Sequence, residues 1–249
     1  MSDQSRPYSE DDDLKRAHRF LFSSAMRYAE EAATMQGGEV APYYEGLFAE
    51  SERSIGILAF TFIESQIRDM FVQQLRPAVD KDTKKIIGHT GILDTVGKQI
   101  NMLGALGWIR PETAADLRLL AKIRNRFAHT HRALKFDDHK IQGLFSSLTK
   151  HEERYAELGF DGDFPGVILQ TRHKFLLRAI GTLYSLYYEL TLMPSSIRAG
   201  YGPTGALGGD FDSYPQALKD ALGWCMHTMI LIYRHAANAT PDTNAGAEK

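Results

Sequence analysis

Segments with apolar residues at every third or fourth position constrain the fold of this chain more than any other feature. The longest runs from about Leu47 to Leu75, and its apolar positions are Phe48, Ile55, Leu58, Phe62, Ile67, Phe71 and Leu75. Because an α-helix has about 3.6 residues per turn, these side chains lie on one face. Alternation of apolar and polar residues, which would indicate a strand, never continues beyond a few positions. The sequence therefore predicts an all-α fold in which the helices pack as a bundle.

The centre of that segment, IGILAFTFI, is apolar nearly all round and predicts a helix in the middle of the bundle. Similar periodicity, bounded by Gly and Pro, predicts further helices that begin at 11–13 and at Pro111, and others over about 92–106, 136–160, 167–193 and 214–236. A stretch rich in Gly, Pro and Ser predicts a loop at 194–215. We expect a helical domain over 11–160, C-terminal helices over 161–236 packed on the same bundle, and disordered ends at 1–10 and 237–249.

The overall charge and the cysteine count exclude several classes of protein. The chain has 249 residues, a formal net charge of −2 and one cysteine, Cys225. A protein that coats nucleic acid through a basic surface all round is therefore excluded, and any contact with a polyanion must come from a local basic patch. One cysteine excludes an intramolecular disulfide and a cysteine metal cluster. The polar N-terminus does not resemble a signal peptide, and neither apolar window, 175–192 or 217–233, predicts a membrane span. We expect a cytoplasmic protein with no membrane contact.

Residues 117–135, LRLLAKIRNRFAHTHRALK, form the strongest candidate site because they contain no acidic residue. Their cations and imidazoles are Arg118, Lys122, Arg124, Arg126, Arg132, Lys135, His129 and His131. On a helix, Asn125 and His129 are four residues apart and share a face. Arg124 and His129 are five residues apart, which separates them by about 140° around the helix axis. They converge on one ligand only if the helix frays near Ala128, or if a second copy of the chain supplies one of them.

Arginine and histidine together suit chemistry on a phosphodiester. The guanidinium of Arg124 can hold phosphate oxygens in a planar fork and stays charged. The imidazole of His129 can move a proton near neutral pH. With RNA, a base activates the 2′-OH for attack on the adjacent phosphate, and this route needs no metal and no other cofactor. The neighbouring side chains that would guide the phosphate backbone are Lys122, Arg126, His131, Arg132 and Lys135.

The alternative interpretation of the same residues is structural. A histidine at a helix end can cap carbonyl groups and lie favourably at the negative end of the helix dipole. Clusters of arginine and lysine are often only the solvated face of a helix.

Two parts of the chain, SERSIGILAFTFIESQIRDMF and GHTGILDTVGKQINMLGALGWIRPETAADLRLLAKIRNRFAH, resemble the mannitol operon repressor family. The resemblance covers roughly residues 50–135. The middle segment of the family's pattern corresponds, with altered spacing, to Lys98, Leu106, Gly107 and Ile109. The terminal motif of the family corresponds to Arg124, Asn125, Phe127, Ala128 and His129. That family resembles a branch of the HEPN superfamily, whose signature is Arg, a polar residue, a few variable residues and His. The resemblance implies a HEPN-like helical bundle, here with additional C-terminal helices, in which Arg and His act across a homodimer.

From the motif and the resemblance we expect an RNA-acting protein, a metal-independent endoribonuclease of toxin or defence type that works as a homodimer. Arg124 would stabilise the phosphate, His129 would transfer the proton, and Asn125 would orient the backbone or His129. The alternative is a non-catalytic transcriptional regulator that acts through protein partners, since the repressor-like relatives have no recognisable DNA-reading helix. A third hypothesis is a toxin that a cognate antitoxin neutralises. Apolar segments 55–63 and 175–190 offer more hydrophobic surface than one bundle needs, which favours a homodimer.

Several residues outside the candidate site have open interpretations. Glu64 is either a carboxylate on the polar edge of its helix or the charge partner of a basic residue on another helix. Cys225 lies in an apolar run and is predicted to be a buried packing residue. The aromatic row at 175–188 is predicted to be core or dimer surface. The remaining histidines lack metal-ligand spacing, and we interpret them as surface or core residues: His89, His139, His151, His173, His227 and His235.

Overall fold

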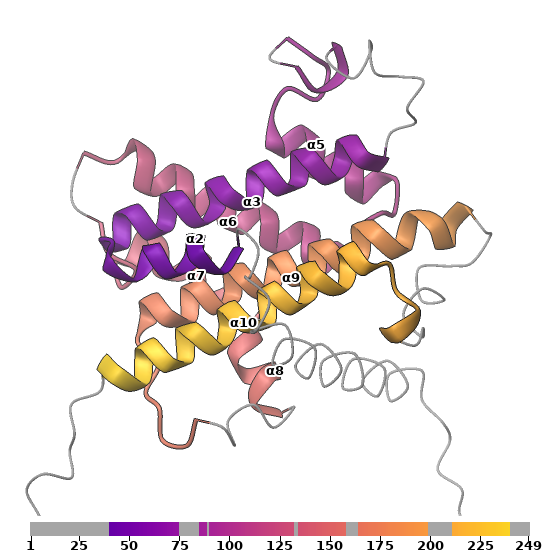
Figure 1. The fold of residues 1–249 in the computed structure, drawn as a ribbon. Helices are drawn as coiled ribbons and strands as arrows, with labels where there is room; N and C mark the ends of the chain where they lie inside the picture. The colour runs from indigo at the N-terminus through magenta and orange to yellow at the C-terminus, as the bar shows by residue number, and fades with distance from the viewer. Residues whose placement is uncertain are drawn as a thin grey trace, which may run out of the picture.

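The computed structural model describes residues 40–74, 85–88, 90–131, 134–157, 164–198 and 211–239. Within these ranges every regular element is a helix, so the all-α prediction is confirmed (Figure 1). The elements are α2 (Val40–Gly46), η1 (Leu47–Ala49), α3 (Glu52–Gln74), α5 (Val96–Ala105), α6 (Pro111–His129), α7 (His139–Ser146), α8 (His151–Glu157), α9 (Thr171–Arg198), η5 (Phe211–Ser213) and α10 (Gln216–Ala239). The helix expected to begin at 11–13 and the N-terminal end at 1–10 lie outside the described residues. None of the described helices is long and apolar enough to cross a membrane.

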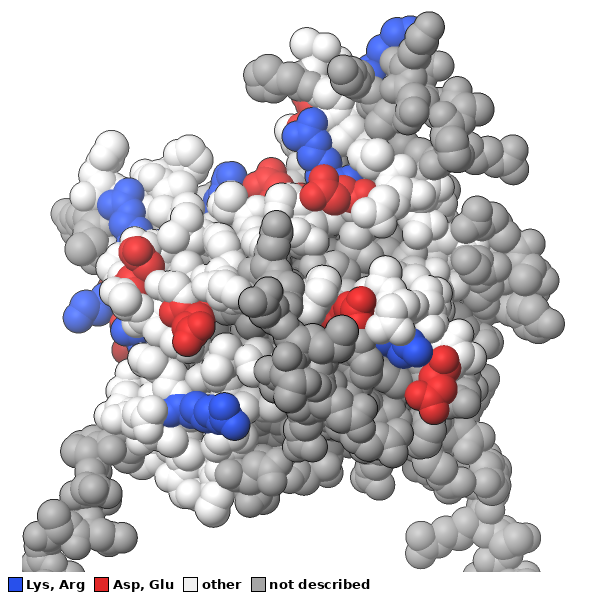
Figure 2. All heavy atoms as spheres, viewed as in Figure 1, with Lys and Arg blue, Asp and Glu red and all other residues white. Residues whose placement is uncertain are grey.

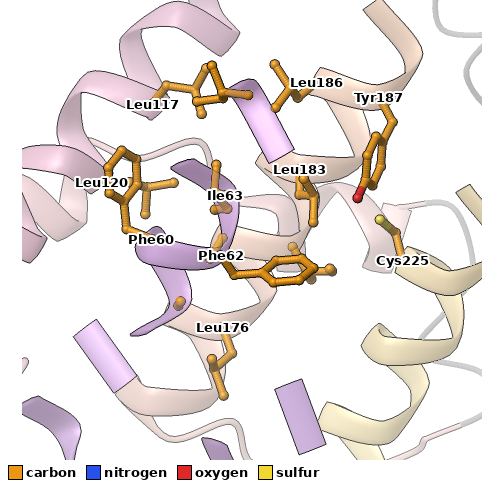
Figure 3. Packing of buried hydrophobic residues seen from close by; sticks show 14 of the residues in the cluster. Phe60, Phe62, Ile63, Leu117, Leu120, Leu176, Leu183, Leu186, Tyr187 and Cys225 are labelled. Atoms are coloured by element: carbon orange, nitrogen blue, oxygen red, sulfur yellow. The ribbon is translucent and has the colours of Figure 1, made fainter. Parts of the chain in front are cut away.

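The core lies where α3, α6 and α9 meet. Side chains of α3 lie between those of α6 and α9 (Figure 3), and α10 packs along α9 on the other side (Figure 1). Buried residues of the three central helices include Phe60 and Ile63 on α3, Leu117 and Leu120 on α6, and Leu183 on α9. Cys225 on α10 is also buried, as predicted, and burial raises the pKa of its thiol well above the ordinary value.

Gly56 brings α3 and α6 close together. A Cβ atom at position 56 would overlap the ring of Phe127, which is fully buried. The aromatic ring therefore packs directly on the backbone of α3. This contact fixes the separation of the two helices near the C-terminal end of α6.

The structure corrects several predicted helix boundaries. The segment 47–75 is divided into η1 and α3, because Glu50 has an extended backbone. The single helix predicted over 136–160 is two helices, α7 and α8. The backbone N–H of Thr149, in the intervening turn, donates to the buried carboxylate of Asp116 on α6 at 3.0 Å, which stabilises the break.

The C-terminal helices also differ from the prediction at their ends. Helix α9 starts at Thr171, later than predicted. A turn at Gly166, whose φ is +76°, and an irregular segment over 167–170 precede it. It then continues through Pro194 to Arg198, so the loop predicted to begin at 194 begins later. A proline removes one backbone donor, but Met193 and Pro194 are both buried in the packing of α9. Helix α10 likewise runs to Ala239, beyond the predicted start of the tail at 237.

The apolar surface of α9 is used inside the chain. Phe175, Tyr187 and Tyr188 are buried, which agrees with the core interpretation of the aromatic row. Helices α3, α6, α8 and α10 all contact α9. The expectation that 175–190 leaves spare hydrophobic surface for a dimer is therefore wrong, and a homodimer must be argued from other observations.

Candidate functional site

Helix α6 carries the candidate site, and its N-terminus is held by α9. The carboxylate of Glu189 accepts hydrogen bonds from the backbone N–H of Arg110 at 2.8 Å, from Arg110 Nε at 2.6 Å and from Thr113 Oγ1 at 2.8 Å. Arg110 is the residue that precedes the first helical position, Pro111. A carboxylate at this end of a helix also interacts favourably with the helix dipole. Glu189 thus anchors the start of α6 from within the core.

The C-terminal end of α6 is held by the first turn of α3. Arg53 Nη2 donates to the carbonyl oxygen of Ala128 at 3.4 Å. Glu52 Oε2 accepts from the backbone N–H of Phe136 at 2.7 Å. Two consecutive residues of α3 therefore hold both sides of the segment 129–135, which contains much of the predicted basic surface.

Arg124 lies beside α3 and has two partners, Glu64 on α3 and its own neighbour Asn125 on α6. Its Nη2 is 3.3 Å from Glu64 Oε2, and its Nη1 donates to Asn125 Oδ1 at 2.9 Å. The side chains of Arg124 and Glu64 are 34% and 35% exposed, so the ion pair stands at the edge of the solvent. Both interpretations of Glu64 therefore hold, because it lies on the polar edge of α3 and is also the charge partner of a basic residue on another helix.

His129 lies on a different face of α6 from Arg124. Helix α6 continues without interruption through Ala128 to His129, so fraying does not bring the two side chains together. Five residues of straight helix separate them by about 140° and about 7.5 Å along the axis. His129 is exposed, and so is Asn125 one turn before it. The described contact of Asn125 is with Arg124, whose Nη1 donates to Asn125 Oδ1. The orienting role of Asn125 towards His129 stays a prediction.

The predicted phosphate-guiding residues surround this end of α6. Those that the structure describes are all exposed, and they are Lys122, Arg126, His131 and Lys135. Arg132 lies outside the described residues. Arg118, one turn before Lys122, donates from Nε and Nη2 to Asn101 Oδ1 on α5 at 3.2 and 2.9 Å. The outer face of α6 from 118 to 129 thus has exposed cations and no carboxylate of its own.

Elsewhere the charges are mixed. On the face drawn in Figure 2, Lys and Arg alternate with Asp and Glu among the described residues. The exposed pairs Lys98–Asp94 and Lys150–Glu153 are local examples, at 2.8 and 2.7 Å. The acid-free surface of α6 is therefore a local patch, as the net charge requires.

Two histidines outside α6, the buried His173 and the half-buried His235, form a hydrogen-bonded pair. His173 Nε2 lies 3.1 Å from His235 Nδ1, and His173 Nδ1 accepts from the backbone N–H of Gln170 at 3.3 Å. Because Nδ1 is an acceptor, the neutral His173 ring carries its proton on Nε2 and donates it to His235. His173 closes the first turn of α9 as the third-position residue of a capping box does. Burial lowers the pKa of His173 to about 4.

The other histidines that the structure describes have no geometry for metal binding. His151 is buried 4.0 Å from Asp116, and burial together with nearby arginines lowers the pKa of this imidazole to about 3. His139 is exposed and His227 is half-buried, whereas His89 lies outside the described residues. Among the residues that the structure describes, no three His, Cys, Asp or Glu side chains gather in a way that could hold a metal ion.

Sequence reasoning located Arg124, Asn125 and His129 on one helix but missed the residues that hold them. Glu52, Arg53 and Glu189 are far from α6 in the sequence, and no local pattern shows which residues of α6 they contact. Charged residues within otherwise apolar helices, such as Glu64 and Glu189, are the one signal that could have found part of this set. Compared with known proteins, the chain matches no family model, no curated protein and no solved structure.

Proposed function

We propose that this protein cleaves RNA without a metal ion, at a composite site to which two copies of the chain contribute. The observation that supports this proposal is the position of Arg124 and His129 on one straight, anchored helix. Their side chains face directions about 140° apart, so neither chain alone presents both to one phosphate. A second copy, related by a two-fold axis, would place the His129 of one chain against the Arg124 of the other.

The chemistry follows from the two side chains. His129 would take the proton of a ribose 2′-OH, and the 2′ oxygen would attack the adjacent phosphorus. The bond from phosphorus to the 5′ oxygen would break, leaving a 2′,3′-cyclic phosphate, and the proton would return to the 5′ oxygen. Arg124 would stabilise the charge on the non-bridging oxygens. The cations of the outer face, among them Lys122 and Arg126, would guide the remaining phosphates.

The resemblance to the mannitol operon repressor family and to HEPN domains supports the same proposal, because it assigns the same arginine and histidine to a composite site. A toxin or defence role, with a cognate antitoxin as a protein partner, belongs to this proposal. Such a partner would act most simply by covering the exposed end of α6.

The test is an assay of purified protein with RNA in the presence of EDTA. We expect cleavage by the wild type, and loss of at least about a hundredfold in Arg124→Ala and His129→Ala, since each group is required for the chemical step. Lys150→Ala is the matched control, because Lys150 is an exposed cation whose partner is Glu153. Equal cleavage by all four proteins would show that a contaminant or another site is responsible.

A second candidate function is a non-catalytic regulator that binds protein partners. The specific observation in its favour is the exposure of large apolar side chains near α5, with Ile92 76% exposed and Leu106 42% exposed. Exposed apolar groups of this kind occur at protein interfaces. A pull-down that recovers a defined partner through these residues, together with intact RNA in the assay above, would decide for this function.

A further inference from the structure

Glu64 is the described acidic side chain that contacts Arg124, and it comes from a different helix. We infer that Glu64 is a positioning residue for Arg124 which also weakens the binding of the RNA backbone. This inference rests on the proposed function, because it concerns the same site. It assigns Glu64 two separable effects, one through its hydrogen bond and one through its charge.

The hydrogen bond of Glu64 fixes the direction of the guanidinium. Both terminal nitrogens of Arg124 are engaged, Nη2 with Glu64 at 3.3 Å and Nη1 with Asn125 at 2.9 Å. Two contacts at different nitrogens define the plane of the group, and its remaining N–H bonds then have set directions. Orientation of this kind matters for a planar donor that must meet a transient phosphate geometry.

The position of Glu64 is itself set by the packing of α3 against α6. Gly56 lets the ring of Phe127 pack on the α3 backbone, and Arg53 holds the carbonyl oxygen of Ala128. Both contacts join the same two helices as the Glu64–Arg124 pair. The packing of α3 against α6 therefore sets the distance between the backbones of Glu64 and Arg124. The ion pair depends on this helix packing as well as on the conformations of the two side chains.

The charge of Glu64 has the opposite effect on binding. A phosphate held by Arg124 would lie close to a carboxylate that is only partly exposed, and like charges at short range repel. Within residues 117–135 the chain has no acidic residue, so this carboxylate is an exception in an otherwise cationic patch. A residue that served binding alone would be neutral or basic here.

Two variants separate the effects. Glu64→Gln removes the charge but keeps an oxygen that can accept from Nη2, whereas Glu64→Ala removes both. We expect each variant to bind RNA several-fold more tightly than the wild type at low salt. We expect Glu64→Gln to keep its single-turnover cleavage rate within about threefold, and Glu64→Ala to lose about tenfold, because only the latter loses the hydrogen bond.

Binding is measured by fluorescence anisotropy with a labelled 2′-O-methyl oligouridine, which has the RNA backbone but lacks the attacking hydroxyl. Single-turnover cleavage is measured with the corresponding unmodified RNA in EDTA. Glu153→Gln is the matched control, since it removes an exposed carboxylate from an ion pair far along the chain and changes the net charge equally. Thermal unfolding checks that the variants are folded. If Glu64→Ala does not fold, Glu64→Gln alone tests the effect of the charge.

The outcomes distinguish this inference from the proposed function. Tighter binding in Glu64→Gln but not in Glu153→Gln, with slower cleavage confined to Glu64→Ala, supports the inference. If the wild type cleaves RNA and Glu64→Gln binds no more tightly than Glu153→Gln, the inference is overturned and the proposed function stands. If the wild type neither binds nor cleaves RNA, both are overturned.

Discussion

Arg110 and Glu189 are 79 residues apart in the sequence, and they form an ion pair of 2.6 Å at the N-terminus of α6. The Glu189 side chain is 0% exposed. Its carboxylate also accepts from Thr113 and from the backbone of Arg110, so the buried charge receives three hydrogen bonds. This cluster joins α9 to the helix that carries the candidate site.

Removal of this carboxylate should destabilise the protein strongly. We expect Glu189→Ala to lower the free energy of unfolding by about 3–5 kcal/mol, because it leaves Arg110 and Thr113 without their buried partner. Urea denaturation measures the change. Lys98→Ala, which breaks an exposed pair with Asp94, is the control and should cost less than about 1 kcal/mol. Similar losses in the two variants would contradict a structural role for the buried cluster.

A composite site predicts that two inactive variants complement each other. In a two-fold dimer of Arg124→Ala with His129→Ala, one of the two sites combines the intact arginine of one chain with the intact histidine of the other. After equimolar mixing and subunit exchange, about half of the dimers are mixed, so we expect about a quarter of the wild-type cleavage activity. Cleavage is followed in EDTA, and each variant alone serves as the control. A mixture that stays inactive although subunits exchange would show that both groups act within one chain.

Any side chain at position 56 should separate α3 from α6. We expect Gly56→Ala to lower the free energy of unfolding by about 1–3 kcal/mol, because the added methyl overlaps the ring of Phe127. Gly97→Ala is the matched control, since Gly97 lies in α5 with nothing near its Cβ position. Alanine has the higher helix propensity, so the control should be unchanged or more stable by up to about 1 kcal/mol. Thermal or urea unfolding distinguishes the two outcomes.

Acid should destabilise the fold through its buried histidines. His173 has a pKa lowered to about 4 by burial, so the folded protein binds its proton less readily than the unfolded chain, whose histidine titrates near 6.5. The contribution of neutral His173 to the free energy of unfolding is therefore fully present above pH 6.5 and decreases as the pH falls from 6.5 towards 4. We expect the free energy of unfolding to fall over this range. His151, with a pKa of about 3, extends the fall to lower pH.

The contribution of His173 can be isolated by a conservative change. His173→Gln keeps an oxygen that can accept from the Gln170 backbone and an amide that can donate to His235, but it does not titrate. Denaturation at several pH values should show a shallower loss of stability between pH 6.5 and 4 than in the wild type. His139→Gln, at an exposed position of α7, is the control. If the free energy of unfolding changes with pH in parallel for His173→Gln and the wild type, the assignment of this pH dependence to His173 is contradicted.

The sequence predicted the helices better than their ends and partners. Helices α3, α6, α9 and α10 each bury an apolar face, and this periodicity is local, so their existence and approximate positions were predictable. The break between α7 and α8 was not, because it depends on the contact of Thr149 with Asp116 across the fold. Likewise, the position of Arg124 and His129 on α6 followed from spacing. The choice of Glu64 as the partner of Arg124 did not, since 60 residues separate them.

The attachment of Ala128 and Phe136 to adjacent residues of α3 has a consequence for how proteins of this kind can diversify. Arg53 holds Ala128 and Glu52 holds Phe136, so the fold fixes both ends of the segment between Ala128 and Phe136. Lengthening such a loop is inexpensive, at about 0.6 kcal/mol for each doubling of its length. Insertions or deletions next to His129 can therefore change the shape and charge of the surface offered to a ligand without any change in the helices that support it.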